Sequence, residues 1–589
     1  MKLSQNMQLD YLSQLNEQQL DAVLCPANIV FTSSGPGTGK TQVLTHKLLH
    51  YIQSSSSRQS IVALSYTNTA ARQLGTRFQA KLTESGITKD FSIYSGTIHS
   101  FCYRMLKQYY ADLQLTILDD EELGELAKDI NESFYGAYSS KEIVQCLKAD
   151  AKVLSSELYD KVTAIKDSLQ VISIQDIMVL FIHAMEEDDS FREWMATQMT
   201  VIAVDEAQDL SALNYDILDL LIDAVPGLKV FLVGDPRQNI FEFNGGSYKN
   251  LEEFLSHHPD HAVKTLTITY RCGQRIADYA NTFQFTDCVN YQLRSFSTVD
   301  GEVHLQRNIC EEEEAAYVLG KVMETEKLND SAVLCNNLKY LGKLVEQLIK
   351  HEVPYKVLGG RKLLKKHIRF LNHVLRIIDT ENAYSIRKVA QYADIDIMQD
   401  GKRKKSKFFE STVGQSILEI REGVAGMSFQ DIVKRILEEI MPEPDEDVSK
   451  DYDAFLSMAE KYSSIQEYLA TFVTDKEQFS QFYEADYQEC PYEIGNDFLT
   501  ISTIHSAKGL EWSNIFIMGL CEGNFPNDYF CQNLPPEEKK EFFNNEWKKM
   551  YVAATRAKEH LLLTYSSTIS RKGFTFPKTP SRFVANVPV

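Results

Sequence analysis

The sequence predicts an α/β protein with two parallel-sheet cores, each interrupted by a mainly helical insertion. In the first half of the chain, short apolar runs alternate with segments of helical periodicity. Such alternation is typical of a parallel sheet, which gathers functional groups at the carboxyl ends of its strands. The same pattern returns in the second half, and two charge-rich helical stretches interrupt it.

The first core is predicted to begin with the apolar run 28–33, which ends in a glycine-rich turn. The next segment, 41–52, has apolar residues at helical spacing, so the order is strand, loop, helix. Residues 103–198 are charged, mostly helical and nearly free of Gly and Pro, which predicts a helical insertion. Further buried strands of this core are predicted at 61–64, 201–204 and 229–233.

The second core is predicted from buried strands at 332–334, 498–503 and 515–518. A second helical, charge-rich stretch lies between about residues 375 and 494 and includes the basic run 401–407. The predicted boundaries are 1–102 and 199–275 for the first core, 103–198 for its insertion, 276–375 and 495–589 for the second core, and 376–494 for its insertion.

Composition limits the classes of partner. The 589 residues include 61 basic and 82 acidic side chains, a net charge of −21, which disfavours tight, non-specific binding of duplex DNA. A narrow channel for a single strand is still compatible with this charge, because aromatic stacking and backbone amides also hold single strands. The ten cysteines include no C-x-x-C pair, so we expect reduced thiols rather than a zinc site.

The start of the chain is polar, and no apolar stretch reaches the roughly 18 residues of a membrane span. We therefore expect a cytoplasmic protein with no membrane partner.

The strongest single motif is SGPGTGKT at Ser34–Thr41, which follows a predicted strand and precedes a predicted helix. Its glycines allow backbone N–H groups to close around phosphate oxygens. Lys40 is placed to reach the terminal phosphates, and the Thr41 hydroxyl is placed to bind Mg²⁺. Ser34 stands where the usual pattern has its first glycine. The predicted ATP-binding residues here are Ser34, Gly35, Pro36, Gly37, Thr38, Gly39, Lys40 and Thr41.

A pair of acids, Asp205 and Glu206, follows the apolar run VIAV. An acid at a strand end can hold Mg²⁺, and the second acid can orient and deprotonate an attacking water. Together with the phosphate-binding loop, this pair predicts nucleotide hydrolysis. Arg271 and Arg556 are candidates to stabilise the charge of the transferring phosphate.

The motif order resembles that of the superfamily 1 DNA helicases of the UvrD/Rep/PcrA group, whose cores are RecA-like. The segments that carry the resemblance are LNEQQLDAV at 15–23, SYTNTAA at 65–71, GTIHSFC at 96–102, VDEAQDLS at 204–211, VGDPRQNIFEFNGG at 233–246, TYR at 269–271, PYKVLGG at 354–360, ISTIHSAKGLEW at 501–512, YVAATRAKEHL at 551–561 and PSRFV at 580–584. They span nearly the whole chain outside the two insertions.

The resemblance implies roles around the nucleotide. Gln19 would contact the adenine, Tyr270 would stack on it, and Glu511 would touch the ribose. Gln238 would sense the γ-phosphate and couple it to DNA. Arg271 and Arg556 would be arginine fingers.

The resemblance also implies a grip on single-stranded DNA. Tyr66, Phe241 and Phe243 would form stacking pockets for bases, a mode of binding that tolerates any sequence. Contacts with the DNA backbone or nearby bases would come from Thr67, Asn68, His99, Thr503 and His505.

Four positions depart from the family pattern. Phe243 and Asn244 replace a Trp-Arg pair, which removes a charge from the network that couples ATP to DNA. Gln42 and Asn336 each stand where many relatives carry Arg. None of these departures removes a group predicted to act in hydrolysis.

Two functions are compatible with these motifs. The first is an ATP- and Mg²⁺-dependent motor that moves 3′→5′ along single-stranded DNA and unwinds 3′-tailed duplexes. The second is a DNA-stimulated ATPase subunit that regulates a separate nuclease partner in repair or phage defence. A small-molecule kinase would leave GTIHSFC, STIHSAKG and VAATRA without a role.

Overall fold

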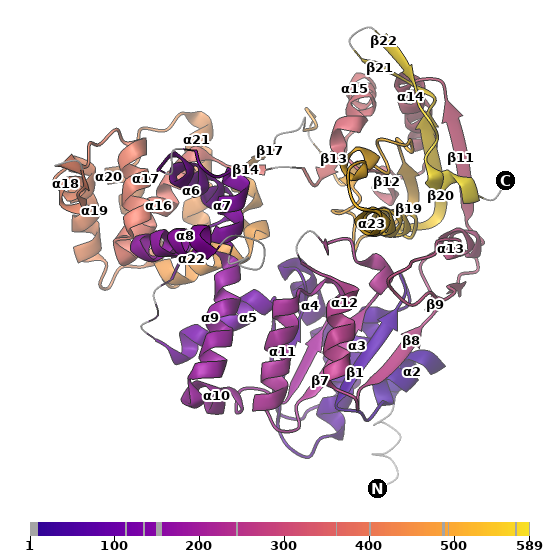
Figure 1. Ribbon diagram of the computed structural model, residues 1–589, viewed down its shortest axis with the longest axis horizontal. Helices are drawn as coiled ribbons and strands as arrows, with labels where there is room; N and C mark the ends of the chain where they lie inside the picture. The colour runs from indigo at the N-terminus through magenta and orange to yellow at the C-terminus, as the bar shows by residue number, and fades with distance from the viewer. Residues whose placement is uncertain are drawn as a thin grey trace. The chain divides into compact units, whose positions relative to one another are not determined.

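The computed structural model describes residues 10–111, 113, 115–133, 136–148, 156–242, 245–360, 362–399, 402–485, 489–492, 494–571 and 574–587 (Figure 1). The chain divides into two compact units. The core unit comprises Met1–Thr97, Arg192–Arg361 and Asp486–Val589, and the insertion unit comprises Ile98–Phe191 and Lys362–Ala485. The individual domain boundaries proposed from the sequence stay predictions.

The first six-stranded sheet of the core unit is parallel throughout, with the order β3-β2-β6-β7-β1-β8. Its strands are β1 (Ile29–Ser34), β2 (Gln59–Leu64), β3 (Phe91–Gly96), β6 (Val201–Val204), β7 (Lys229–Gly234) and β8 (Ala262–Leu266). Strands β1 and β6 are buried along their whole length, which explains their continuous apolar character. The helices of this sheet are α2 (Glu17–Leu24), α3 (Lys40–Ser54), α4 (Asn68–Ser85), α11 (Ala212–Ala224) and α12 (Tyr248–His257).

The second six-stranded sheet is also parallel, with the order β11-β20-β19-β12-β18-β13. Its strands are β11 (Glu302–Asn308), β12 (Ser331–Cys335), β13 (Tyr355–Leu358), β18 (Leu499–Thr503), β19 (Trp512–Ile517) and β20 (Ala557–Ser566). The accompanying helices are α13 (Gln274–Asn281), α14 (Glu311–Met323), α15 (Gly342–Lys350) and α23 (Pro536–Ala554). The prediction of two RecA-like parallel-sheet cores is therefore confirmed.

Smaller pairings complete the core unit. Strand β9 (Ile268–Thr269) pairs in parallel with β10 (Arg294–Ser295), and β21 (Thr568–Arg571) pairs antiparallel with β22 (Phe574–Pro577). The first pairing holds the residues before Tyr270 in place, and this tyrosine also donates its backbone N–H to the Gly37 carbonyl at 2.8 Å. The TYR motif is thereby fixed against the phosphate-binding loop.

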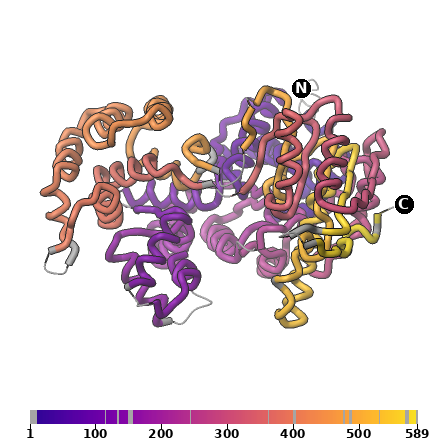
Figure 2. Tube along the Cα trace, turned by 90° about the horizontal axis from the view of Figure 1, so that it is seen from above, coloured from indigo at the N-terminus to yellow at the C-terminus, as the bar shows by residue number. Residues whose placement is uncertain are grey.

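The insertion unit combines helices from both interruptions of the cores (Figure 2). The first interruption supplies α5 (Ile98–Tyr109), α6 (Asp120–Ser133), α7 (Ser140–Leu147), α8 (Ser156–Leu169) and α9 (Ile174–Glu187). The second supplies α16 (Lys366–Thr380), α17 (Ala383–Tyr392), α18 (Lys405–Phe409), α19 (Thr412–Gly423), α20 (Phe429–Glu439), α21 (Glu446–Ala459) and α22 (Ile465–Thr474). Tyr384 of α17 is fully buried among apolar side chains of α6, α7 and α8, so the two interruptions share one hydrophobic core.

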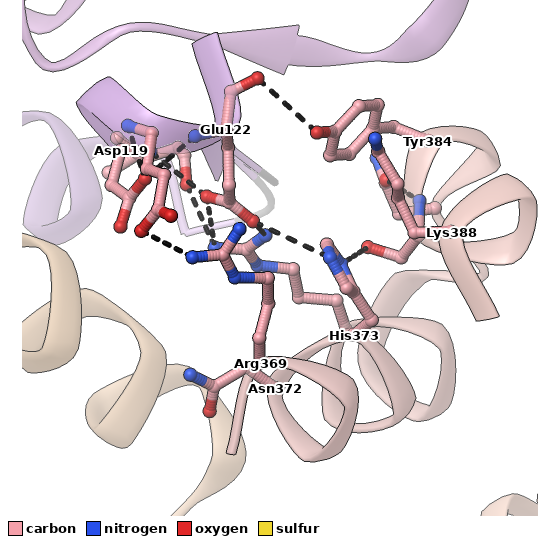
Figure 3. Close-up of polar contacts among 12 residues, drawn as sticks. Asp119, Glu122, Arg369, Asn372, His373, Tyr384 and Lys388 are labelled. Carbon is pink, nitrogen blue, oxygen red and sulfur yellow. Dashed lines mark hydrogen bonds and ion pairs between the residues drawn. The ribbon is translucent and has the colours of Figure 1, made fainter. Parts of the chain in front are cut away.

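Buried ion pairs also join the two interruptions (Figure 3). Arg376 pairs with Glu122, and both side chains are almost fully buried. Arg369 and Lys388 reach Glu125 at 2.6 and 2.7 Å. Arg369 is therefore committed to structural ion pairs.

Among the residues that the structure describes, we find no helix with the combination of length and apolar character that a bilayer crossing requires.

Candidate functional site

The phosphate-binding loop lies between the end of β1 and the start of α3. Gly37 and Gly39 have φ angles of 70° and 89°, a left-handed conformation that favours glycine. A Cβ atom at Gly37 would lie 2.4 Å from Cβ of Arg271, and one at Gly39 would lie 2.6 Å from Nε2 of Gln19. Both glycines are thus required by backbone geometry and by close packing.

Ser34, the departure from the usual loop pattern, has a structural use. Its hydroxyl lies 2.6 Å from the hydroxyl of Thr38, which also donates to the Gly35 carbonyl at 2.8 Å. These contacts close the loop on itself. Lys40 begins α3, and its ammonium lies 3.4 Å from the Ser34 carbonyl. Its ammonium and the helix N-terminus together favour an anion.

The acidic pair lies at the carboxyl end of β6. Asp205 is buried. Its pKa is raised, mainly by burial and to a lesser extent by the charge of the neighbouring Glu206. Burial opposes ionisation of Glu206 as well, but Lys40 and Lys508 outweigh it and lower the pKa of this carboxyl. The Glu206 backbone N–H donates to Oδ1 of Asp205 at 3.0 Å, and Gln208 donates to the Glu206 carboxylate at 2.6 Å. Glu206 is therefore held ionised, in the form that a general base requires.

The two candidate arginines make different contacts. Nη2 of the buried Arg556 donates to Oε1 of Gln238 at 2.9 Å. Burial and the Arg271 charge lower the pKa of Arg556 to about 9, which leaves its guanidinium charged at neutral pH. Arg271 pairs with Glu511 at 2.6 Å and donates to the Thr555 carbonyl at 3.2 Å.

A continuous hydrogen-bonded path leads from Arg556 to Glu206. Gln238 donates to Asp235 at 2.8 Å, and the Asp235 backbone N–H donates to Gln208 at 2.9 Å. Gln208 completes the path through its contact with Glu206. Lys508 of the second core adds a parallel link, because it pairs with Asp209 at 2.5 Å and donates to the Gln238 carbonyl at 2.8 Å. Asp235, Gln208, Asp209 and Lys508 lie inside the quoted motifs, but no role was predicted for them.

The residues predicted at the adenine differ in burial. Gln19 is buried and uses both ends of its amide, donating to the Thr38 carbonyl at 3.0 Å and accepting from the Asn16 backbone at 3.1 Å. It braces α2 against the phosphate-binding loop. Tyr270 is 44% exposed, and its hydroxyl accepts from Asn16 at 2.8 Å. Phe296, for which the sequence carried no signal, lies 5.0 Å from the Tyr270 ring and is 67% exposed.

Two of the residues predicted to stack on DNA bases contact each other. The rings of Tyr66 and Phe241 are stacked at 5.0 Å with an interplanar angle of 19°. His505 lies 6.2 Å from the Phe241 ring, and the Lys508 ammonium lies 4.9 Å above it. Phe243 and Asn244 lie outside the described residues.

The remaining predicted DNA contacts are polar. Thr67 caps α4 by accepting the Ala70 N–H at 3.2 Å, and Asn68 is the first residue of that helix. The Thr503 hydroxyl lies 3.0 Å from that of Ser506. His99 belongs to the insertion unit, and burial lowers its pKa to about 4.

The two parallel sheets and the loop between β1 and α3 place the chain in the class of P-loop proteins with two RecA-like cores. Family models make the assignment specific. The model described as the UvrD/REP helicase N-terminal domain matches residues 15–166 and 139–259, and the UvrD-like helicase C-terminal domain matches 264–412 and 426–568. The chain belongs to the UvrD-like helicase family.

Individual relatives align over nearly the whole chain. The ATP-dependent DNA helicase PcrA of Staphylococcus aureus (strain Mu50) is 26% identical, and the alignment covers 98% of this chain and 86% of the relative. The protein of the same name from Staphylococcus epidermidis (strain ATCC 12228) is 25% identical with the same coverage.

Proposed function

We propose that this chain is an ATP-dependent DNA helicase that moves 3′→5′ along single-stranded DNA. The observation that carries the proposed motor is the path from Arg556 through Gln238 and Asp235 to Glu206. The proposed direction rests on the resemblance of the motifs to those of superfamily 1 helicases. Two residues after Gln238, the same segment reaches Ile240 and then Phe241, which stacks on Tyr66. Groups that face the nucleotide and groups suited to bases are therefore only three residues apart in the chain.

Hydrolysis would use the side chains of the core unit directly. Lys40 and the N–H groups of the loop would hold the phosphates, and Tyr270 would stack on the base with Glu511 at the ribose. The ionised Glu206 would take a proton from the attacking water while Arg271 and Arg556 offset the charge of the phosphate. The Asp205 carboxylate and the Thr41 hydroxyl are hard oxygen donors that fit Mg²⁺, which supplies charge neutralisation at the phosphates.

Movement would follow from the state of the nucleotide. The γ-phosphate attracts Arg556 and Gln238, and its loss after hydrolysis removes those contacts. Because Gln238 and Phe241 lie on one short segment, a change at the phosphate would alter the grip on a base between Phe241 and Tyr66. Thr67, Asn68, His99, Thr503 and His505 would contact the strand as neutral polar groups. Phe243 is proposed as a further stacking residue on the basis of its motif alone.

The proposal is tested with the purified chain on duplexes that carry either a 3′ or a 5′ single-stranded tail. We expect ATP turnover that depends on single-stranded DNA, and unwinding of the 3′-tailed substrate only. Preferential unwinding of the 5′-tailed duplex would contradict the direction. ATPase activity that responds to DNA without unwinding of either substrate would instead favour the regulatory subunit of a separate nuclease.

A further inference from the structure

The segment 237–242 belongs to the first core by sequence but packs against the second. It follows β7, yet Ile240 is only 3% exposed and lies in the hydrophobic cluster formed by α13, α23, β19 and β20. Arg237 is also buried, with its guanidinium 3.5 Å from the Tyr291 ring and 4.6 Å from the ring of Tyr551 on α23. The segment therefore has its main packing partners in the second core.

Glu242 fastens this segment to α23 by charge. Lys548 of α23 has no exposed side-chain surface, and its ammonium lies 3.1 Å from the Glu242 carboxylate. The same ammonium pairs with Asp287, and Asn545, one turn earlier on α23, donates to Glu242. Burial raises the pKa of Glu242, and the Lys548 charge opposes that shift.

An ion pair whose cation is fully buried resists separation. If the segment left α23, the buried Lys548 ammonium would lose one of its two carboxylate partners. Segment and helix should therefore move together when the cores move. The helix is the one that leads to Arg556, which lies eight residues after Lys548 and contacts Gln238.

The attachment of Glu242 to α23 also affects the neighbouring Phe241. Phe241 directly precedes Glu242, whereas its stacking partner Tyr66 follows β2 of the first core. A segment that travels with α23 carries Phe241 with the second core and leaves Tyr66 with the first. The spacing between the two rings then depends on how the cores are placed relative to one another.

We propose that Glu242 and Lys548 are a positioning pair that couples the phosphate sensed by Arg556 to the base slot between Phe241 and Tyr66. The inference rests on the proposed function, because it assigns a use to the ATP site and to the stacked rings. It also offers a source of charge for coupling in a chain whose sequence has Asn244 in place of the arginine of its relatives.

The test compares Glu242→Gln, Lys548→Met and Lys548→Arg in the full chain. Arg582→Met is the control, because Arg582 pairs with Glu522 at 2.7 Å and its guanidinium lies 3.9 Å from the Phe543 ring of α23. Two quantities are measured: ATP turnover with and without single-stranded DNA, and the fluorescence of a 2-aminopurine strand with and without a non-hydrolysable ATP analogue. Circular dichroism establishes that each variant is folded. If Lys548→Met does not fold, Glu242→Gln still tests the pair, because it preserves the shape of the side chain.

For Glu242→Gln we expect the stimulation by DNA to fall about tenfold, within the usual range of coupling free energies, while turnover without DNA keeps its kcat and KM. The fluorescence response to the ATP analogue should shrink in parallel. Lys548→Arg should retain most of both responses, and Arg582→Met should resemble the unaltered protein.

Unchanged stimulation in folded Glu242→Gln would overturn the inference. Equal losses with and without DNA would overturn it too, because they would show that Glu242 supports hydrolysis itself. If single-stranded DNA does not stimulate ATP turnover by the unaltered protein, the proposed function is refuted. This outcome is distinct from a failure of the Glu242–Lys548 pair.

Discussion

At the scale of single residues, Asp205 and Glu206 show how neighbouring carboxyl groups acquire opposite proton affinities. Both are carboxyl groups in one strand end, but the pKa of Asp205 is raised by burial and by Glu206. The pKa of Glu206 is lowered because Lys40 and Lys508 outweigh the effect of burial. The two carboxyls thus differ in their affinity for a proton, and the lowered pKa of Glu206 favours the ionised form that its proposed role as a general base needs.

Replacement of Glu206 by Gln tests this division. The amide keeps the size of the side chain but cannot accept a proton from water, so we expect turnover to fall by about a thousandfold. Affinity for ATP, measured by equilibrium titration, should change little because the phosphate-binding loop is intact. Glu253→Gln, an exposed position on α12, is the control. Near-normal turnover in Glu206→Gln would remove Glu206 from the role of general base.

His505 gives a prediction about pH. Burial, then the charges of Lys549 and Lys508, lower the pKa of His505 to about 4. A depressed folded-state pKa contributes stability above the unfolded value of about 6.5, and this contribution is lost as pH falls toward 4. We therefore expect His505→Asn to tolerate acid better than the unaltered chain in this window. The measurement is the midpoint of acid unfolding followed by circular dichroism. A lower tolerance in the variant would show that His505 is protonated in the folded protein.

At the scale of elements, burial explains which strands the sequence could predict. Strand β6 coincides with the predicted run 201–204 because every side chain in it is buried. The strands β3, β8 and β11 lie at sheet edges and carry exposed side chains, so no continuous apolar run marks them. Sequence pattern therefore finds central strands more readily than edge strands.

The candidate site divides in a similar way. The phosphate-binding loop and the acidic pair are local motifs, so their residues could be named from spacing alone. The contact of Arg556 with Gln238 spans 318 positions, and that of Lys508 with Asp209 spans 299. Phe296 has no motif, and its place beside Tyr270 results from the pairing of β9 with β10. Such contacts depend on tertiary packing, which local patterns do not encode.

The ion pairs of the insertion unit lead to a prediction for stability. Arg376 and Glu122 are 4% and 7% exposed, so removal of Arg376 leaves a buried carboxylate without its main partner. We expect Arg376→Met to lower the free energy of unfolding by about 3–5 kcal/mol, as for other broken buried pairs. Urea unfolding followed by circular dichroism measures this change.

The matched control is Arg435→Met, because Arg435 and Glu439 form a more exposed pair on one helix. Its loss should cost at most about 1 kcal/mol. Equal effects of the two substitutions would show that the Arg376 pair adds no more than a surface contact.

At the scale of the whole molecule, the acidic net charge restricts how DNA can be held. Because the net charge is −21, the composition does not suggest that a broad basic surface provides the affinity for DNA. The groups proposed to face the strand are mainly aromatic or neutral polar side chains, including His505, whose low pKa keeps it uncharged at pH 7. Stacking on bases depends less on salt than phosphate contacts do, which suits an acidic protein.

Because the chain divides into two compact units, a bound ligand can stabilise one unit more than the other. Every residue proposed to contact ATP belongs to the core unit, and the insertion unit has its own hydrophobic core and ion pairs. A ligand stabilises the part of a protein whose folded form it binds, by about 2.7 kcal/mol at a hundredfold excess over Kd. We therefore expect a non-hydrolysable ATP analogue with Mg²⁺ to slow amide hydrogen exchange in the core unit, most strongly around the loop at Ser34–Thr41.

Exchange in helices α6, α16 and α17 should change little, and Lys40→Ala should remove the protection from the core unit. The measurement is hydrogen exchange read by mass spectrometry, with and without the analogue. Protection of equal size in the insertion unit would mean that the two units unfold as one cooperative body, since the analogue would then stabilise residues that it does not contact.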